Sequence, residues 1–458
     1  MKIRKITLQN YRAFKHFECE FEPDLNVLVG LNGQGKTSIL DAVAVAYGQF
    51  VGGFGTGKDK GVLNGDIHLA KLIGDSDDLD DATSMNFTME YQLPVKVCVD
   101  AYKSEYFDCP LYWERSLNTL KSRTTQVKKL KAFANRLQKD VQDNTQVLLP
   151  LISYYGTGRL WAQKRLSEKN NPQNKKDSRL DGYQNCLDPE SSYNAFSSWL
   201  RKETIADFER KMQIIEQSGL EGAMVSGKTI RSRLLSAITN AINVVLSPSG
   251  WFNLRYSASS QQIIASHIEQ GDVPVSLLSD GVRNMIGMVA DIAYRAVRLN
   301  PYLHENAVIE TPGVVLIDEV DMHLHPEWQQ LILQSLTKAF PKLQFIVTTH
   351  SPQVLTTVKR EKIRLLTSTN GKGLASLPIG FTYAEASNDL LERVMNVDSK
   401  PPLPEVKLYR RYMQLVDSGH YKSEEALEYR QELEQAFGLE HEYLLKADRS
   451  IRRQEFLS

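Results

Sequence analysis

A phosphate-binding loop near the N-terminus constrains the fold more than any other segment. Residues 30–37 match G-x-x-x-x-G-K-[ST], and they lie between the apolar run Leu25–Val29 and the helical run Ser38–Tyr47. In this arrangement the glycine-rich turn directs backbone N–H groups at phosphate oxygens, and the helix N-terminus adds the positive end of its dipole. The sequence therefore predicts an α/β protein that binds a nucleoside triphosphate.

The polar residues of this loop have distinct predicted roles. Lys36 brings a positive charge to the phosphates and so contributes to catalysis, and the hydroxyl of Thr37 is a ligand for Mg²⁺. The loop residues predicted to contact ATP are Gly33, Gln34, Gly35, Lys36, Thr37 and Ser38. ATP and Mg²⁺ are thus the predicted substrate and cofactor.

Two other segments resemble the same motif. Residues 222–229 match it fully, but they follow the polar stretch Lys211–Gln217 instead of a buried strand. Residues 52–59 place Asp59 where the hydroxyl residue belongs, so a ligand for Mg²⁺ is missing there. We interpret both as chance matches and assign nucleotide binding to residues 30–37.

An acidic pair follows a second buried strand. The run Val314–Ile317 is continuously apolar, which predicts a central strand of a parallel sheet. It ends at Asp318 and Glu319, at the sheet edge where ligands bind in open α/β folds. Asp318 would hold Mg²⁺ through water, and Glu319 is placed to orient or deprotonate the water that attacks the phosphate. The alternative is that the two carboxylates only end a buried strand.

Three further segments complete a known series. Residues 277–284, L-L-S-D-G-V-R-N, resemble the L-S-G-G-Q signature of ABC ATPases, although Asp280 and Val282 depart from it. Asp321 stands in the position of the D-loop, and residues 345–350, F-I-V-T-T-H, are predicted to be a strand that ends in the histidine where the family has its switch. Together with the loop at residue 30 and the acidic pair, these segments are similar in order and spacing to the motifs of an ABC ATPase.

The resemblance implies that the chain works as a pair of heads. In ABC ATPases the signature residues, here Ser279, Asp280 and Gly281, contact the γ-phosphate that a second subunit holds. A second copy of this chain is therefore the first expected partner. The resemblance also implies that His350 is a catalytic residue that donates to a γ-phosphate oxygen and so reports whether the nucleotide is a di- or triphosphate. The alternative for His350 is a strand-end histidine without such a role.

The N-terminal segment narrows the subtype. Residues 3–14, I-R-K-I-T-L-Q-N-Y-R-A-F, resemble the opening strand and the N-(F/Y)-R-x-F turn of SMC, RecF and OLD-type ATPases. This resemblance implies that Arg12 approaches the nucleotide phosphates and that Asn32 reaches the γ-phosphate. The alternative for Arg12 is an ordinary surface arginine.

We predict an α/β fold: an ABC-type ATPase head of two lobes, with a mixed sheet and the phosphate-binding loop, a short helical insertion and a helical C-terminal tail. The predicted parts are lobe I at 1–160, a polar loop and helices at 161–247, lobe II at 248–385 and the tail at 386–458. Strand candidates include 148–155, Trp251–Tyr256 and Gln262–His267. Helix candidates are Tyr193–Gln217, Ile230–Val245, Leu403–Asp417 and Glu424–Phe437, the last with Ser423 as N-cap and Gly438 at its end. Residues 156–159 stand where the family has its Q-loop but offer no glutamine.

Composition limits the class of protein. The 458 residues are 24% charged and 42% hydrophobic, which is ordinary for a globular protein. No run approaches the roughly 18 apolar residues that a membrane-spanning helix needs, and the N-terminus begins as a strand and not as a secretory signal. Because the cysteines show no C-x-x-C pairing, the sequence predicts neither a zinc site nor a disulfide framework. We expect a cytoplasmic protein with no membrane partner.

Because the formal net charge is zero, any binding to nucleic acid must come from local basic patches. Residues 121–139 carry seven basic and no acidic side chains in a segment of helical character, and residues 159–179 form a second basic and polar region. Either region could contact DNA or RNA phosphates, and either could be a solvated surface. The sequence leaves both interpretations open.

The tail carries no recognisable nuclease motif. It lacks the acidic array of the Toprim nuclease of OLD-type enzymes, and no H-N-H or P-D-(D/E)-x-K pattern occurs elsewhere. No heptad array is long enough for an SMC arm. An SMC-like head with a helical insertion and tail is similar to PtuA, the ATPase subunit family of Septu and retron-associated anti-phage systems. This resemblance implies a separately encoded HNH nuclease, PtuB-like, whose activity depends on the nucleotide state, with the tail as a candidate docking element.

Two other functions remain open. A RecF-like ATPase of recombination or repair would bind DNA by itself and in a salt-dependent manner. An autonomous nuclease would need a second active site, for which the sequence offers no residues.

Overall fold

The structure is a computed structural model that describes residues 1–73, 87–143, 146–159, 178–189, 194–225, 229–369 and 371–457. It divides into two compact units, Met1–Leu390 and Leu391–Ser458. The finer division of the first unit into two lobes and an insertion stays a prediction. Most of the basic region 159–179 and Lys228 of the second loop motif lie outside the described residues.

A large mixed sheet runs through the first unit. Ten of the described strands form this sheet, in the order β7-β6-β1-β2-β15-β14-β3-β13-β12-β8. Their bounds are β1 Ile3–Tyr11, β2 Phe14–Glu20, β3 Leu25–Val29, β6 Val95–Ala101, β7 Tyr112–Leu117, β8 Leu151–Tyr155, β12 Gly313–Ile317, β13 Leu343–Thr348, β14 Ile363–Thr369 and β15 Lys372–Ser376. From β14 to β8 the neighbours are parallel, and from β7 to β2 they are antiparallel. The predicted α/β class with a mixed sheet is confirmed.

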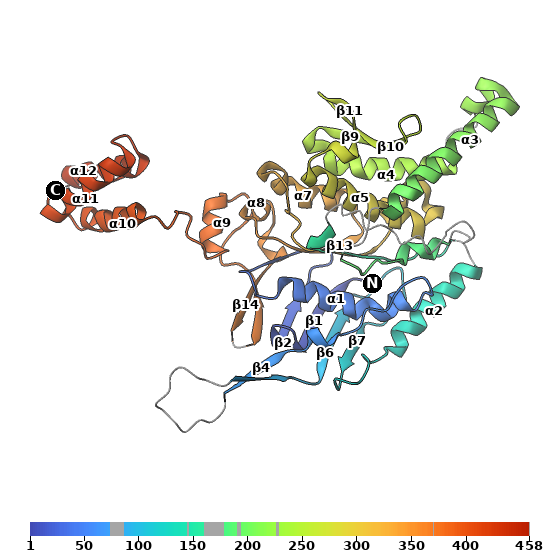
Figure 1. The fold of residues 1–458 in the computed structure, drawn as a ribbon, viewed down its shortest axis with the longest axis horizontal. Coiled ribbons are helices and arrows are strands. Elements are labelled where there is room, and N and C mark those ends of the chain that lie inside the picture. The colour runs from blue at the N-terminus through green and yellow to red at the C-terminus, as the bar shows by residue number, and fades with distance from the viewer. Residues whose placement is uncertain are drawn as a thin grey trace. The chain divides into compact units, whose positions relative to one another are not determined.

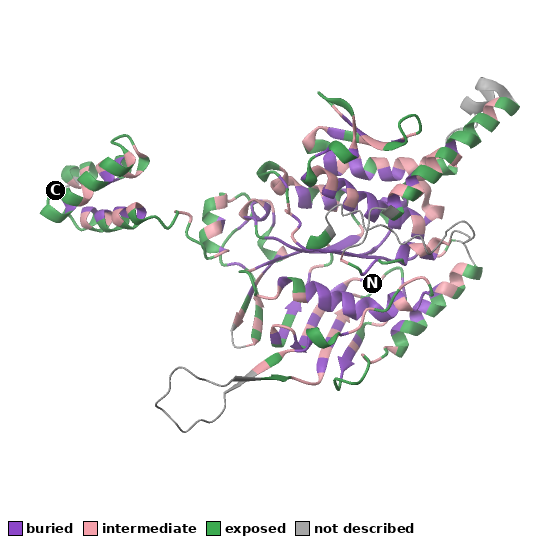
Figure 2. Ribbon diagram, in the orientation of Figure 1, coloured by how far each residue is buried: buried purple, intermediate pink, exposed green. Residues whose placement is uncertain are grey.

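The parallel strands are buried because helices cover both faces of the sheet. In Figure 1, α1 (Lys36–Gly52) lies on one side of these strands, and α5 (Asp280–Leu299) lies on the other. Every residue of β3, β8, β12 and β13 is buried, as Figure 2 shows for the centre of the unit. This burial explains why these strands are almost continuously apolar in sequence.

The remaining described elements of the first unit lie outside this sheet, and the last of them, α9, crosses the boundary to the second unit. The other described strands are β4 Leu69–Ile73, β5 Phe87–Tyr91, β9 Trp251–Ser257, β10 Gln262–His267 and β11 Gly271–Pro274. The other described helices are α2 Lys128–Asp143, α3 Asn194–Val225, α4 Ile230–Leu246, α6 Ala307–Glu310, α7 Pro326–Ala339, α8 Pro352–Leu355 and α9 Ser387–Arg393. Strands β9 to β11 form an antiparallel sheet, so the predicted meander is confirmed. Helix α4 agrees with its prediction, whereas α3 continues past the predicted end because no proline interrupts residues 217–225.

The second unit contains three helices, α10 Pro404–Asp417, α11 Glu424–Phe437 and α12 Glu442–Leu457. The first two confirm the predicted tail helices: Ser423 Oγ accepts from the Ala426 backbone N over 3.2 Å, and Gly438 ends α11 with a φ of +84°. The third helix was not predicted. The core residues of this unit are Tyr409, Tyr412, Val416, Ala426, Leu433, Leu444 and Ala447. The unit therefore has a hydrophobic core of its own.

The described helices also bear on membrane association. None of them combines the length and the apolar character that crossing a membrane requires.

Candidate ATP-binding site

The loop at residues 30–37 has a backbone that only glycine adopts easily. Gly33 and Gly35 have φ angles of +83° and +86°. A Cβ on Gly35 would lie 2.4 Å from the Phe14 ring, so a larger residue is also excluded by space. Helix α1 begins at Lys36, directly after the turn. The predicted order of strand, glycine turn and helix is present, and it places backbone N–H groups at the helix N-terminus where an anion binds.

The ammonium of Lys36 folds back over its own loop. It donates to the carbonyl oxygens of Gly30 and Leu31 over 2.8 and 3.2 Å. Burial lowers the pKa of Lys36, while the nearby carboxylates of Asp318 and Glu319 act in the opposite direction. A cation that donates to neutral carbonyls of the loop fits a site that accepts a phosphate.

Asp318 connects the phosphate-binding loop to the centre of the sheet. Its Oδ2 accepts from the Thr37 hydroxyl over 2.8 Å, and its Oδ1 accepts from the Thr348 hydroxyl over 2.6 Å. Asp318 is only 3% exposed. A threonine hydroxyl beside a carboxylate is an oxygen donor set that suits Mg²⁺, so the residues present fit this ion. The structure thus brings together the two residues predicted to hold it.

Glu319 sits at a sharp bend where β12 ends. Its φ is +46°, a conformation that is uncommon for a residue with a side chain. Its backbone N donates to Thr348 Oγ1 over 2.7 Å, and the backbone N of Val320 donates to the Thr348 carbonyl over 3.0 Å. Strain of this kind is found at functional sites, where the surroundings impose it.

Two further predicted residues flank the acidic pair. Asp321 lies close enough to Lys36 to influence its pKa, and its Oδ1 is buried without a hydrogen-bond partner among the described residues. His350 is exposed. The prediction that the strand extends to His350 is wrong: β13 ends at Thr348, and the Thr349 hydroxyl accepts from the backbone N of Ser351 where the chain turns.

The signature residues lie at the start of α5. Ser279 is the N-cap residue and makes no capping bond, and both Ser279 and Asp280 are exposed. Gly281 is buried, and a Cβ there would lie 2.2 Å from the carbonyl oxygen of His323. The glycine is therefore required by packing against the D-loop segment of the same chain. No hydrogen bond or ion pair joins these three residues to residues 30–37 in the described part of the chain.

The Arg12 guanidinium forms ion pairs with two carboxylates of its own chain. Its Nη1 pairs with Asp41 over 2.6 Å, and its Nε pairs with Asp66 over 2.7 Å. Lys60 pairs with the other oxygen of Asp41 over 2.9 Å. Asp41 belongs to α1, so this network lies on the helix that starts at the loop. The predicted contact of Arg12 with phosphates stays a prediction.

The other predicted loop residues differ in their surroundings. Asn32 is exposed, and Ser38 is half-buried. The side chain of Gln34 accepts from the backbone N of Ser368 over 2.5 Å, so it ties the loop to β14.

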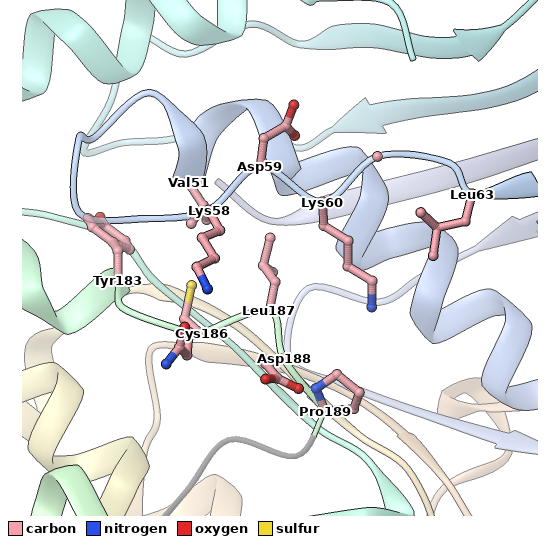
Figure 3. Close-up of a pocket in the computed structure, with 12 residues that line it drawn as sticks. Val51, Lys58, Asp59, Lys60, Leu63, Tyr183, Cys186, Leu187, Asp188 and Pro189 are labelled. Atoms are coloured by element: carbon pink, nitrogen blue, oxygen red, sulfur yellow. The ribbon is translucent and has the colours of Figure 1, made fainter. Parts of the chain in front are cut away.

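A cavity of about 330 Å³ lies at the far end of α1. In Figure 3, Lys58 extends toward Cys186, whereas Asp59 points away from it. Asp59 is held by Arg115, which is fully buried and donates to it over 2.7 Å. The lining includes none of the residues predicted to contact ATP, so the predicted site does not depend on this cavity. The interpretation of residues 52–59 as a chance match stays a prediction.

Sequence reasoning did not single out Thr348, although it joins three residues of the site. Thr348 is a hydroxyl residue at the end of a mostly apolar strand, and this was the available signal. Asp41 and Lys60 offered no comparable pattern.

Known proteins resemble the chain along most of its length. A family model described as "AAA domain" matches residues 5–218, and one described as "AAA domain, putative AbiEii toxin, Type IV TA system" matches residues 254–356. The Retron Vc95 probable ATPase of Vibrio cholerae serotype O1 biovar El Tor is 28% identical, over 92% of this chain and 84% of the relative. The Retron Ec83 probable ATPase of Escherichia coli is 27% identical, over 99% of this chain and 87% of the relative.

The chain is an ATPase. A further relative, the Septu protein PtuA of Bacillus mycoides (strain KBAB4), is 47% identical over 75 residues, which are 16% of this chain and 10% of that protein. The resemblance of this ATPase to retron ATPases is thus global, whereas its resemblance to PtuA is strong but local.

Proposed function

We propose that this ATPase is the ATP-binding and hydrolysing regulatory subunit of an anti-phage defence complex and controls a separately encoded HNH nuclease. The observation that carries the proposal is the similarity to two retron ATPases over 92% and 99% of this chain. The local similarity to PtuA supports the same function. Because this similarity extends over nearly the whole chain, it includes both the head and the C-terminal tail.

The proposed reaction is hydrolysis of ATP at the loop. The oxygen of a water molecule forms a bond to the γ-phosphorus, the bond from that phosphorus to the bridging oxygen of ADP breaks, and Glu319 accepts the proton of the water. Lys36 and the loop N–H groups bind the phosphates. Mg²⁺, held by Thr37 and Asp318, would neutralise charge on the phosphate oxygens.

The proposed active form is a pair of heads. Ser279 and Asp280 are exposed at the start of α5, where they are accessible to a second copy of the chain. In this arrangement they would contact the γ-phosphate held by that copy, with Gly281 allowing close approach. His350, also exposed, would report whether the nucleotide is a di- or triphosphate.

The second unit is the proposed docking element for the nuclease. It has its own core, so it can keep its fold while it binds a partner. It also exposes large apolar side chains: Leu427 is 59%, Leu439 66% and Phe456 89% exposed. These side chains are available to an apolar surface of a partner.

Co-expression with the neighbouring gene tests the proposal. A tagged full-length chain should co-purify with an HNH nuclease encoded beside it, and the pair should reduce phage plating in a host. Lys36→Ala should abolish protection while both proteins are still made. Full protection by the Lys36→Ala pair, or by the chain without the nuclease, would contradict the proposed control.

A RecF-like DNA-binding ATPase is the second candidate, and one observation favours it. Helix α2 buries Leu130 and Phe133, while the basic residues of segment 121–139 are all exposed: Lys121, Arg123, Lys128, Lys129, Lys131, Arg136 and Lys139. A protein that uses several such contacts binds DNA with an affinity that falls steeply with salt. Strong, salt-dependent DNA binding by the isolated chain, lost when Lys128, Lys129 and Lys131 become Glu, would favour this candidate.

A further inference from the structure

Thr348 makes hydrogen bonds to three consecutive residues at the end of β12. Its hydroxyl donates to Asp318 Oδ1 over 2.6 Å and accepts from the Glu319 backbone N over 2.7 Å. Its carbonyl oxygen accepts from the backbone N of Val320 over 3.0 Å. Thr348 is 0% exposed, so water cannot replace these bonds without local opening.

The chemistry at this position requires a hydroxyl. A hydroxyl donates and accepts at the same time, which suits a carboxylate on one side and an N–H group on the other. Valine has nearly the same shape but could do neither. Without the hydroxyl, the partly buried N–H of Glu319 and the buried Oδ1 of Asp318 would each lose this partner, and such a loss is costly away from water.

The same hydroxyl acts on a strained backbone. Glu319 has a φ of +46°, which non-glycine residues keep only where their surroundings impose it. The bond from its N–H to Thr348 is one contact that holds this conformation. The direction in which the Glu319 side chain leaves the backbone depends on that conformation.

We propose that Thr348 is a positioning residue for ATP hydrolysis: its hydroxyl fixes the Glu319 backbone and the Asp318 carboxylate so that the Glu319 side chain faces the attacking water. The inference rests on the proposed function, in which Glu319 accepts the proton of that water. Thr348 acts through these two residues and needs no contact with ATP.

Two substitutions at Thr348 and one control test the inference. Thr348→Val should lower kcat on the order of 10²-fold, the cost of a small misplacement of a catalytic group. ATP affinity should stay close to that of the unaltered chain, and Thr348→Ser should restore most of kcat because serine keeps the hydroxyl. The matched control is Thr382, which is 1% exposed and donates to the Val358 carbonyl over 2.7 Å away from the loop. Thr382→Val should lower the melting temperature without changing kcat.

Two further measurements test the positioning role. If Thr348 acts as proposed, Thr348→Val should speed amide hydrogen exchange at residues 318–320 without any nucleotide, because the Glu319 N–H loses its acceptor. Added to Glu319→Gln, it should lower single-turnover hydrolysis no further, since both changes then remove the same step. A full additional loss in the double variant, or unchanged exchange at residues 318–320, would overturn the inference.

The possible failures are distinguishable. If Glu319→Gln hydrolyses ATP at the normal rate, the proposed chemistry fails and the inference fails with it. If Glu319→Gln is inactive but Thr348→Val keeps a normal kcat, the proposed function stands and this inference alone is overturned.

Discussion

The hydroxyl of Thr37 donates a 2.8 Å hydrogen bond to Oδ2 of Asp318, a residue 281 positions further along the chain. The bond joins the first turn of α1 to the residue that follows β12, so both oxygen donors meet within one head. Ser279 and Asp280, in contrast, are exposed at the start of α5. In the proposed pair of heads, each chain would contribute the loop side of one ATP site and the signature side of the other.

The choice among the three loop motifs gives the first prediction. Lys36→Ala should abolish ATP binding, because the ammonium of Lys36 lies within the loop that precedes α1. The matched control is Lys228→Ala, in the full motif copy at residues 222–229, which should change ATP affinity little. A labelled-ATP binding assay on both variants is sufficient. Retained binding in Lys36→Ala together with loss in Lys228→Ala would reverse the assignment.

The packing of Gly281 gives the second prediction. A methyl group there would lie 2.2 Å from the His323 carbonyl oxygen, so Gly281→Ala should destabilise the chain by about 1–3 kcal/mol, as overpacking in a buried place does. Gly55→Ala is the control, since a Cβ at Gly55 meets nothing within 4 Å. Denaturant unfolding of both variants measures the difference. Equal stability of the two variants would contradict this prediction, because it would mean that α5 and the D-loop segment can move apart to accept the methyl group without loss of stability.

Composite sites give the third prediction. Ser279→Arg should block hydrolysis by placing a bulky cation near the γ-phosphate of the second chain, while each chain still binds ATP. Mixing inactive Ser279→Arg chains with inactive Lys36→Ala chains should restore part of the activity. The restored site would combine the loop of the first chain with the signature of the second. If well-exchanged mixtures recover no hydrolysis, the two heads do not share ATP in this way.

Much of this site could be predicted from sequence, because its parts are local. The turn at residues 30–37 and the acidic residues after β12 depend on short segments whose burial shows as apolar runs. The bounds of β3 and α11 agree with the predicted ranges Leu25–Val29 and Glu424–Phe437, since glycine and a capping serine mark their ends.

What the sequence did not predict depends on contacts between distant segments. The bonds of Thr348 to residues 318 and 319 exist because β12 and β13 are neighbours, which no local pattern reveals. The ion pairs of Arg12 with Asp41 and Asp66 arise in the same way, because the three residues belong to separate segments of the chain. Helix α12 was not predicted, although Leu444, Ala447 and Ile451 stand at helical spacing and pack in the core of the second unit.

The second unit gives the fourth prediction. Deleting residues 404–458 removes α10 to α12 and leaves all predicted ATP-binding residues in place. ATP binding should therefore persist, whereas co-purification with the nuclease and protection against phage should be lost. Phage plating and affinity purification measure the two losses, and nucleotide binding by the truncated chain is the control. Undiminished co-purification would place the nuclease contact in the first unit.

The rate of ATP hydrolysis by Glu319→Gln tests the central claim most directly. Glutamine keeps the shape of the side chain but cannot accept the proton of the attacking water, so hydrolysis should fall by at least about 10²-fold. ATP binding should remain intact, and paired heads should accumulate with ATP bound. Hydrolysis at the normal rate, with the same ATP affinity, would contradict the assignment of Glu319 and with it the account of this site.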